Sequence, residues 1–171
     1  MPFSEKDKEI MSLALKEAEE AGKQGNFPIG SALAINGNLI DVGRNQLHIN
    51  GDWYSHAENR LIEKYSKLIM KEKKKGSKIE IYSTLEPCFM CFGTSLLHRI
   101  PNITFGCPDP YGGVAGLDKN NFPIFYRDRW PEIRSGLMAK ESCDLLLNFF
   151  ASKNTKEFRE MFNTYKNLKL E

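Results

Sequence analysis

The sequence predicts an α/β domain in which helices cover a sheet. Some stretches of the 171 residues have apolar residues three and four positions apart, as helices do. Other stretches alternate between apolar and polar residues, as half-buried strands do. The two kinds follow one another in the order α-β-β-α-β-α-β, and further helices end the chain. This alternation favours a sheet layered with helices, and the length is that of a single domain over residues 1–171.

The first third of the chain predicts one helix and one hairpin. Apolar residues at helical spacing follow Ser4, a residue that suits a helix N-cap. Two short apolar stretches, 31–35 and 39–42, then flank Asn36-Gly37. Both turn residues tolerate the positive φ that a two-residue hairpin turn requires. We therefore expect two antiparallel strands directly after the first helix.

The rest of the chain continues the alternation up to a long loop. Residues 107–131 contain four prolines and three glycines, which predicts an irregular segment. A long loop in a compact domain often has a functional role. The other expected elements are a helix over 55–70, a strand over 78–84, a helix between 87 and 101, a strand over 102–105, and helices over 139–151 and 156–168.

Composition places the chain among ordinary soluble proteins. Hydrophobic residues make up 41% and charged residues 27%, and no apolar run approaches the about 20 residues that cross a bilayer. The first residues do not resemble a signal peptide, so we expect a cytoplasmic protein without membrane contact. Reduced thiols are then expected at Cys88, Cys91, Cys107 and Cys143. The net charge of +2 neither indicates nor excludes a nucleic-acid partner.

Two short motifs at the starts of expected helices combine the side chains of a metal site. The first is His56-Ala-Glu58, and the second is Pro87-Cys88-Phe-Met-Cys91. Zinc prefers imidazole and thiolate ligands, and a catalytic zinc has three protein ligands with one position left for water. A helix start also favours the thiolate form of cysteine. We therefore expect Zn²⁺ held by His56, Cys88 and Cys91.

Glu58 is the candidate catalytic residue. It lies two positions from the expected histidine ligand, so its carboxylate can reach the metal's water without binding the metal. There it would accept a proton from water and deliver protons to a ring nitrogen and a leaving amine. The two motifs together match the H-x-E…P-C-x-x-C signature of zinc deaminases, and the joint pattern is far more specific than either half.

Other interpretations of these residues are open. Cys88 and Cys91 could form a redox pair, although this would leave the histidine and glutamate unexplained. A structural zinc site would need another cysteine, and Cys107 and Cys143 are available, although Cys143 lies in an apolar run typical of a core. A non-catalytic zinc-stabilised binding module is an alternative of another class. Glu58 distinguishes it, because a structural zinc has no use for an acid beside an open position.

These motifs make the chain resemble the cytidine deaminase-like superfamily, in particular its branch of tRNA adenosine, guanine and cytosine deaminases. The resemblance covers about residues 8–152 and implies a three-layer α/β/α fold with a mixed, roughly five-stranded sheet. It also implies a closing strand and helix from 132 to 150, and a homodimer. Its further landmarks are Pro28-Ile-Gly30, the Asn36-Gly37 hairpin, Gly43-Arg-Asn45, Thr84-Leu-Glu86 and Phe105-Gly106.

The resemblance also implies substrate contacts. Asn45 would hydrogen-bond the base, although such a residue at a strand end can equally be a turn residue. Backbone groups near Ile29, Ala57 and Glu86 would complete the pocket. Asp109 is in register with the loop of the tRNA-editing members. The implied substrates are an adenosine in a tRNA anticodon loop, ranked first, and a free base or small nucleoside such as guanine or cytosine, ranked second.

Several residues depart from the pattern of the tRNA enzymes. Pro108 and Tyr111 replace basic residues of the loop, and Asn59 replaces an aliphatic residue after the glutamate. Trp53 and Tyr54 stand before the histidine, where relatives have small residues. These two aromatic residues could stack on a flipped or free base, or pack at a dimer rim. The departures weaken the assignment to tRNA and leave the expected deaminase chemistry unchanged.

Overall fold

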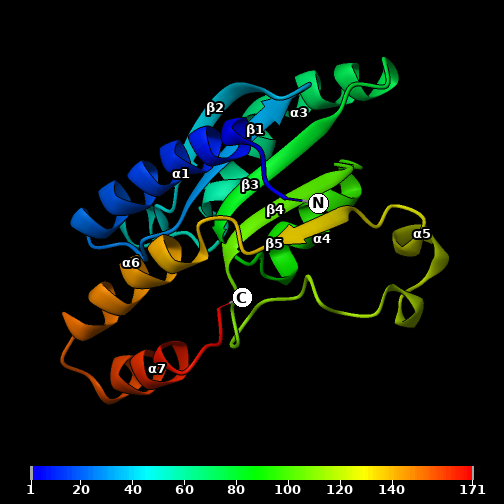
Figure 1. The fold of residues 1–171 in the computed structure, drawn as a ribbon. Helices are drawn as coiled ribbons and strands as arrows, with labels where there is room; N and C mark the ends of the chain where they lie inside the picture. Colours follow the sequence, from blue (N-terminus) through cyan, green and yellow to red (C-terminus); the bar gives the residue numbers. More distant parts are fainter. Residues whose placement is uncertain (1, 171) are drawn as a thin grey trace.

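The computed structural model describes residues 2–170 and contains one mixed sheet with helices on both faces (Figure 1). The strands are β1 (Gly30–Ile35), β2 (Asn38–Arg44), β3 (Ile79–Leu85), β4 (Asn102–Cys107) and β5 (Glu132–Ser135). The helices are α1 (Glu5–Lys23), α2 (Leu47–Asn50), α3 (Ala57–Lys74), α4 (Phe89–Leu97), α5 (Ile124–Arg127), α6 (Ala139–Ala151) and α7 (Lys156–Lys166), with a 3-10 turn at Lys119–Asn121.

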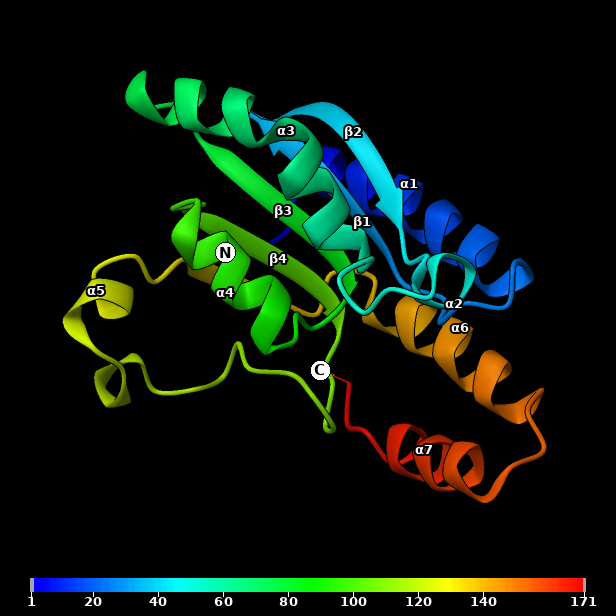
Figure 2. The same ribbon diagram turned by 180° about the vertical axis from the view of Figure 1, so that it is seen from behind.

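The sheet has the strand order β2-β1-β3-β4-β5. The first three strands in this order pair antiparallel, and β3, β4 and β5 pair parallel. The predicted hairpin joins β1 to β2, with Asn36 at φ 52° and Gly37 at φ 72°. Helices α1 and α6 cover one face (Figure 1), and α3 and α4 cover the other (Figure 2). The predicted α/β/α fold with a mixed five-stranded sheet is therefore confirmed.

Apolar packing on both faces holds the layers together. Met11 and Ala14 of α1 pack on β1 and β3, and Ile62 and Ile69 of α3 pack on the opposite face. Gly30 lies where α1 crosses the start of β1, and a Cβ atom there would overlap the backbone oxygen of Ala14. The missing side chain lets α1 lie directly against the sheet.

The structure corrects two expectations. Residues 107–131 are not wholly irregular, because the 3-10 turn and α5 lie within them. Cys107 at the end of β4 and Cys143 on α6 form a disulfide, so the expectation of reduced thiols is wrong for this pair. The two cysteines are 36 residues apart in sequence, and only the packing of α6 on the sheet brings them together. None of the helices in residues 2–170 has the length and apolar character of a membrane span.

Candidate active site

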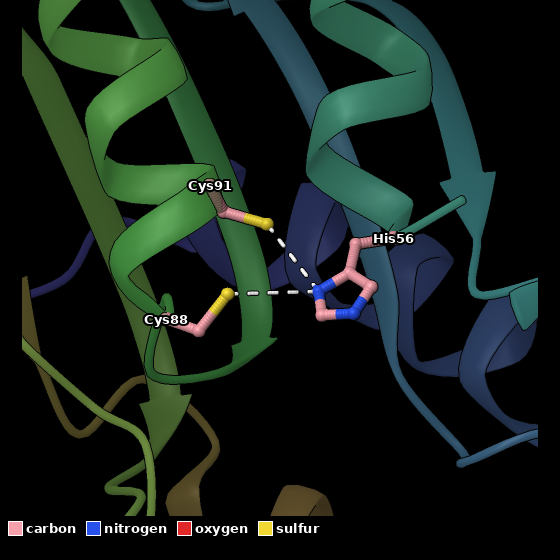
Figure 3. A group of neighbouring side chains, drawn as sticks. All are labelled: His56, Cys88 and Cys91. Carbon is pink, nitrogen blue, oxygen red and sulfur yellow. Dashed lines mark hydrogen bonds between the residues drawn. The ribbon is translucent and has the colours of Figure 1, made fainter. Parts of the chain in front are cut away.

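Two helix N-termini bring three metal-ligand side chains together beside the end of β3. His56 is the N-cap residue of α3, and Cys88 is the N-cap residue of α4. Cys91 follows in the first turn of α4. The Sγ atoms of Cys88 and Cys91 each lie 3.6 Å from Nδ1 of His56. Figure 3 shows both sulfur atoms facing the histidine ring. The ligand atoms of all three residues lie within 4.8 Å of one another.

These separations have the dimensions of a tetrahedral zinc site. Bond lengths of about 2.1 Å to nitrogen and about 2.3 Å to sulfur place the two ligand atoms about 3.6 Å apart at the tetrahedral angle. The two nitrogen–sulfur separations of 3.6 Å agree with this value. Three protein ligands also leave the fourth position of the metal for water or substrate. The residues present therefore fit zinc.

The closeness of the three groups changes their protonation. The hydrogen bond from the Cys91 thiol, and after it the one from His56, lowers the pKa of Cys88 to about 4. Bonding to Cys88 raises the pKa of His56. The same bonding, together with burial, raises the pKa of Cys91. Cys88 is thus the thiolate of the group, and binding of a metal ion would displace the remaining protons.

Glu58 lies in the first turn of α3, two residues after His56, and its side chain is buried with 4% exposure. The Ser83 hydroxyl donates a hydrogen bond to its Oε1 at 3.2 Å. Burial raises the pKa of the Glu58 carboxyl, and the nearby Cys88 thiolate adds to the effect. Ser83 belongs to β3, so the sheet fixes the position of this carboxyl group beside the ligand set.

A pocket opens beside His56, Glu58 and Cys88. Tyr54 and Ala57 are not part of its lining. Ala57 is fully buried in α3, and Tyr54 is an exposed residue whose pKa is raised by partial burial and by the Glu63 carboxylate. Their substrate contacts stay predictions. The other predicted substrate residues do line the pocket, namely Ile29, Asn45, Trp53, Glu86 and Asp109.

Asn45 has the turn role that sequence alone could not separate from base binding. Its side-chain Oδ1 accepts a hydrogen bond from the backbone N–H of Leu47 at 2.9 Å, at the start of α2. The side chain is nonetheless part of the pocket wall. Because the oxygen is engaged, the amide nitrogen is the group that Asn45 can offer as a donor to a ligand.

The sequence did not identify the remaining wall of the pocket. It consists of aromatic and aliphatic residues, with Met161 and Tyr165 of α7 among them. The Tyr165 hydroxyl donates to Oδ1 of Asp109 at 2.7 Å across 56 residues of sequence. The helical spacing of apolar residues predicts α7, but it does not predict which part of the chain α7 packs against. The other unpredicted lining residues are Phe27, Leu47, Leu85, Tyr111, Leu146 and Phe150.

Known proteins resemble this chain over most of its length. A tRNA-specific adenosine deaminase of Bacillus subtilis (strain 168) is 33% identical over 151 residues, which cover 88% of this chain and 92% of that protein. A tRNA-specific adenosine deaminase of Agrobacterium fabrum is 34% identical over 144 residues, covering 84% and 93%. A structure from a study of A-to-I editing by tRNA:A34 deaminases at the wobble position of transfer RNA is 30% identical, with a TM-score of 0.64, and the match covers 81% of this chain and 99% of that one.

The family model of the cytidine and deoxycytidylate deaminase zinc-binding region matches residues 4–107. This range includes both zinc motifs and ends with β4. The predicted resemblance and the predicted zinc cofactor are confirmed at the level of the family, since the matched region is a zinc-binding one and the chain has a group that fits the ion. The chain therefore belongs to the cytidine and deoxycytidylate deaminase family and carries its zinc-binding deaminase domain.

Proposed function

We propose that the protein hydrolyses the bond between a nucleobase ring and its exocyclic amine and releases ammonia. His56, Cys88 and Cys91 hold the zinc ion in this proposal. The observation that carries it is the group of three ligands, of which His56 and Cys88 line the same pocket as the buried Glu58 carboxyl. A bound zinc supplies a Lewis acid that lowers the pKa of a water ligand to about 7.

Glu58 moves the protons of the reaction. Its carboxylate accepts a proton as water adds to the ring carbon, and it returns protons to the ring nitrogen and to the amine. The carbon–oxygen bond forms, the carbon–nitrogen bond breaks, and the amine leaves as ammonia. The Ser83 hydrogen bond to Oε1 holds the carboxyl in place, and its burial keeps bulk water from competing for the protons.

The substrate residues act on the base in two ways. Asn45 offers its amide nitrogen as a donor to the ring. Trp53 lines the pocket although its side chain is 77% exposed, so it stands at the mouth, where an aromatic face can stack on a base. Ile29 and Glu86 complete the wall, and Asp109 contributes a carboxylate at its edge.

Two substrate classes have support. An adenosine in a tRNA anticodon loop is supported by the relatives that act on tRNA, which are about one third identical to the chain. A free base or nucleoside is supported by α7, whose Met161 and Tyr165 form part of a mostly apolar and aromatic pocket wall.

An ammonia-release assay tests the function. Purified protein with stoichiometric zinc is incubated with free bases, nucleosides and an anticodon stem-loop. We expect release from at least one of them, and a loss of about 10²–10⁴ in kcat in Glu58→Gln with its zinc content unchanged. Full activity of Glu58→Gln would refute the proton-transfer role. A zinc-loaded protein inactive on all substrates would support the alternative of a non-catalytic zinc-stabilised module.

A homodimer, a cytoplasmic location and a single domain over 1–171 complete the proposal. Large apolar side chains are exposed along α3 and α4, among them Met70, Phe89 and Leu97, and such exposure favours an association surface. Light scattering coupled to gel filtration distinguishes dimer from monomer. The Cys107–Cys143 disulfide is unusual for a reducing compartment, so thiol titration of protein isolated under denaturing alkylation tests the location.

A further inference from the structure

We propose that α7, through Tyr165, makes this pocket selective for an uncharged free base or nucleoside over a nucleotide or an RNA loop. The inference rests on the deaminase function proposed above and names the substrate class of the same site. Tyr165 acts as a specificity-determining residue in this proposal. We call Asp109, Tyr111, Met161 and Tyr165 the cover of the pocket.

Helix α7 is firmly packed on the pocket end of α6. Thr155 caps its start by accepting a hydrogen bond from the backbone N–H of Phe158 at 3.3 Å. The ring centroids of Phe150 and Phe158 lie 6.0 Å apart, and those of Phe150 and Tyr165 lie 5.3 Å apart. Tyr165 is only 4% exposed. The helix is thus part of the folded core around Phe150, and its pocket-facing residues are fixed in place.

Three contacts join α7 to the loop after β4. The Tyr165 hydroxyl donates to Asp109 Oδ1 at 2.7 Å, and the Tyr111 hydroxyl lies 2.9 Å from Oγ1 of Thr164. The rings of Tyr111 and Tyr165 stack, with centroids 6.2 Å apart and planes at 14°. Burial, followed by the Asp109 carboxylate, raises the pKa of Tyr165 far above its usual range. Its hydroxyl therefore stays a donor throughout the working pH range.

The loop is in turn joined to the metal ligands. The Glu86 carboxylate accepts hydrogen bonds from the backbone N–H groups of Asp109 and Ala115, both at 3.0 Å. Cys88 follows Glu86 by two residues. Gly113 packs so closely on Glu86 that an added Cβ would overlap its carboxylate. The position of α7 relative to the zinc ligands is therefore set by a continuous series of contacts.

The charged residues that line this pocket disfavour a phosphate. Three lining residues carry carboxylates, namely Glu58, Glu86 and Asp109, and the lining found among residues 2–170 contains no lysine or arginine. The phosphate of a nucleotide would approach these carboxylates with no lysine or arginine of the lining to balance its negative charge. An uncharged base or nucleoside avoids this repulsion and fits the apolar and aromatic wall.

The first test compares matched substrates on the full-length, zinc-loaded protein. Ammonia release is measured for adenine, guanine and cytosine, for their nucleosides and 5′-monophosphates, and for an anticodon stem-loop RNA. We expect kcat/KM for the preferred base or nucleoside to exceed that of its monophosphate at least about tenfold, and the RNA to do no better than the monophosphate. Equal or faster turnover of the monophosphate or the RNA overturns this inference and leaves the deaminase function intact. No ammonia from any compound overturns the proposed function itself and this inference with it.

The second test isolates Tyr165. Tyr165→Phe keeps the ring packing and removes the hydrogen bond to Asp109, so we expect KM for the preferred substrate to rise about threefold to tenfold. The value of kcat should change little, and the ratio of kcat/KM between the preferred substrate and its monophosphate should decrease. Tyr126→Phe, on α5 and outside the pocket, is the matched control and should change neither. An unchanged discrimination ratio in Tyr165→Phe overturns the role of Tyr165. Calorimetric binding of both ligands to Glu58→Gln gives the same ratio without turnover.

Discussion

The pocket has two sides that are built in different ways. The metal side comes from two short motifs, each within the first turn of a helix, and consists of His56, Glu58, Cys88 and Cys91. The cover comes from a loop and a C-terminal helix, and its central hydrogen bond joins residues 56 positions apart. The chemistry of the site is thus encoded locally, whereas its choice of substrate depends on how distant elements pack.

This difference predicts separable effects of substitution. Substitutions on the metal side should abolish zinc binding or turnover, while the affinity for substrate can still be measured in a binding experiment. Changes in the cover should alter KM and stability while the zinc content stays the same.

The largest effect is expected from removing both sulfur ligands. Cys88→Ala combined with Cys91→Ala leaves a single imidazole, which cannot hold zinc against dilution. We expect loss of stoichiometric zinc in elemental analysis and ammonia release at background. His98→Gln is the control, because this histidine bonds to Ser66 and Thr94 away from the ligands and should leave the zinc in place. Retention of one zinc per chain in the double variant would contradict the ligand set.

The next effect concerns Glu86, which connects the metal side to the loop of the cover. Glu86→Gln replaces a carboxylate that accepts from two backbone N–H groups with an amide, so one N–H group faces an NH₂ group and loses its acceptor. We expect the free energy of unfolding in urea to fall by about 1–3 kcal/mol, and KM to rise with the zinc content unchanged. Glu9→Gln, at an exposed position of α1, is the control. Zinc loss in Glu86→Gln would show that the metal side depends on the cover.

Smaller effects are expected at the two tryptophans, one on substrate binding and the other on stability. Trp53 lines the pocket but is mostly exposed, so Trp53→Ala should weaken substrate binding by about 0.5–1.5 kcal/mol without changing stability. Trp130 packs on Phe92 with ring centroids 4.9 Å apart, so Trp130→Ala should lower stability and leave KM unchanged. Thermal unfolding and steady-state kinetics on both variants measure this. An unchanged KM in Trp53→Ala would exclude stacking on the substrate.

The smallest effect expected on the pocket itself comes from an ion cluster outside it. Burial alone raises the pKa of Asp7, but hydrogen bonds from Arg134, Tyr82 and Ser4 outweigh it, and the pKa lies well below its usual range. A lowered folded-state pKa stabilises the fold at pH values above the unfolded-state pKa. This stabilisation is therefore constant between pH 7 and 5 and declines below about pH 4. The free energy of unfolding in urea, measured at pH 7, 5 and 3.5, should fall at pH 3.5 in the wild type and fall less in Asp7→Asn. Equal decreases in the two proteins would contradict the assignment of this effect to Asp7.

Local sequence signals predicted much of the fold because their structural effect is confined to a few residues. Ser4 and Asp7 exchange the hydrogen bonds of a helix cap, and Asn36-Gly37 forms the expected turn. Four-residue elements such as α2 and α5 escape a periodicity argument, because four residues make barely one helical turn. The closing strand β5 was expected only through the family resemblance, since four residues are also too few for alternation to be distinctive.

The candidate metal group could be predicted because residues within one motif stay close in space, and because the deaminase signature names the two motifs together. The Tyr165–Asp109 contact and the Cys107–Cys143 disulfide could not, since each depends on where a helix docks. Trp53 illustrates the intermediate case. Its unusual residue type drew attention from sequence alone, but only the structure distinguishes its place at the mouth from that of Tyr54, which is outside the lining.

The Cys107–Cys143 disulfide also closes a covalent ring around the segment between its two cysteines, which includes the long loop, β5 and the start of α6. A protease that cuts once inside this ring leaves two fragments that remain linked through sulfur. The nicked protein should therefore migrate as one band on a denaturing gel and separate into two only after a reducing agent is added. Any proteolytic mapping of this chain has to be done under both conditions, because the loop can be cut without the molecule coming apart.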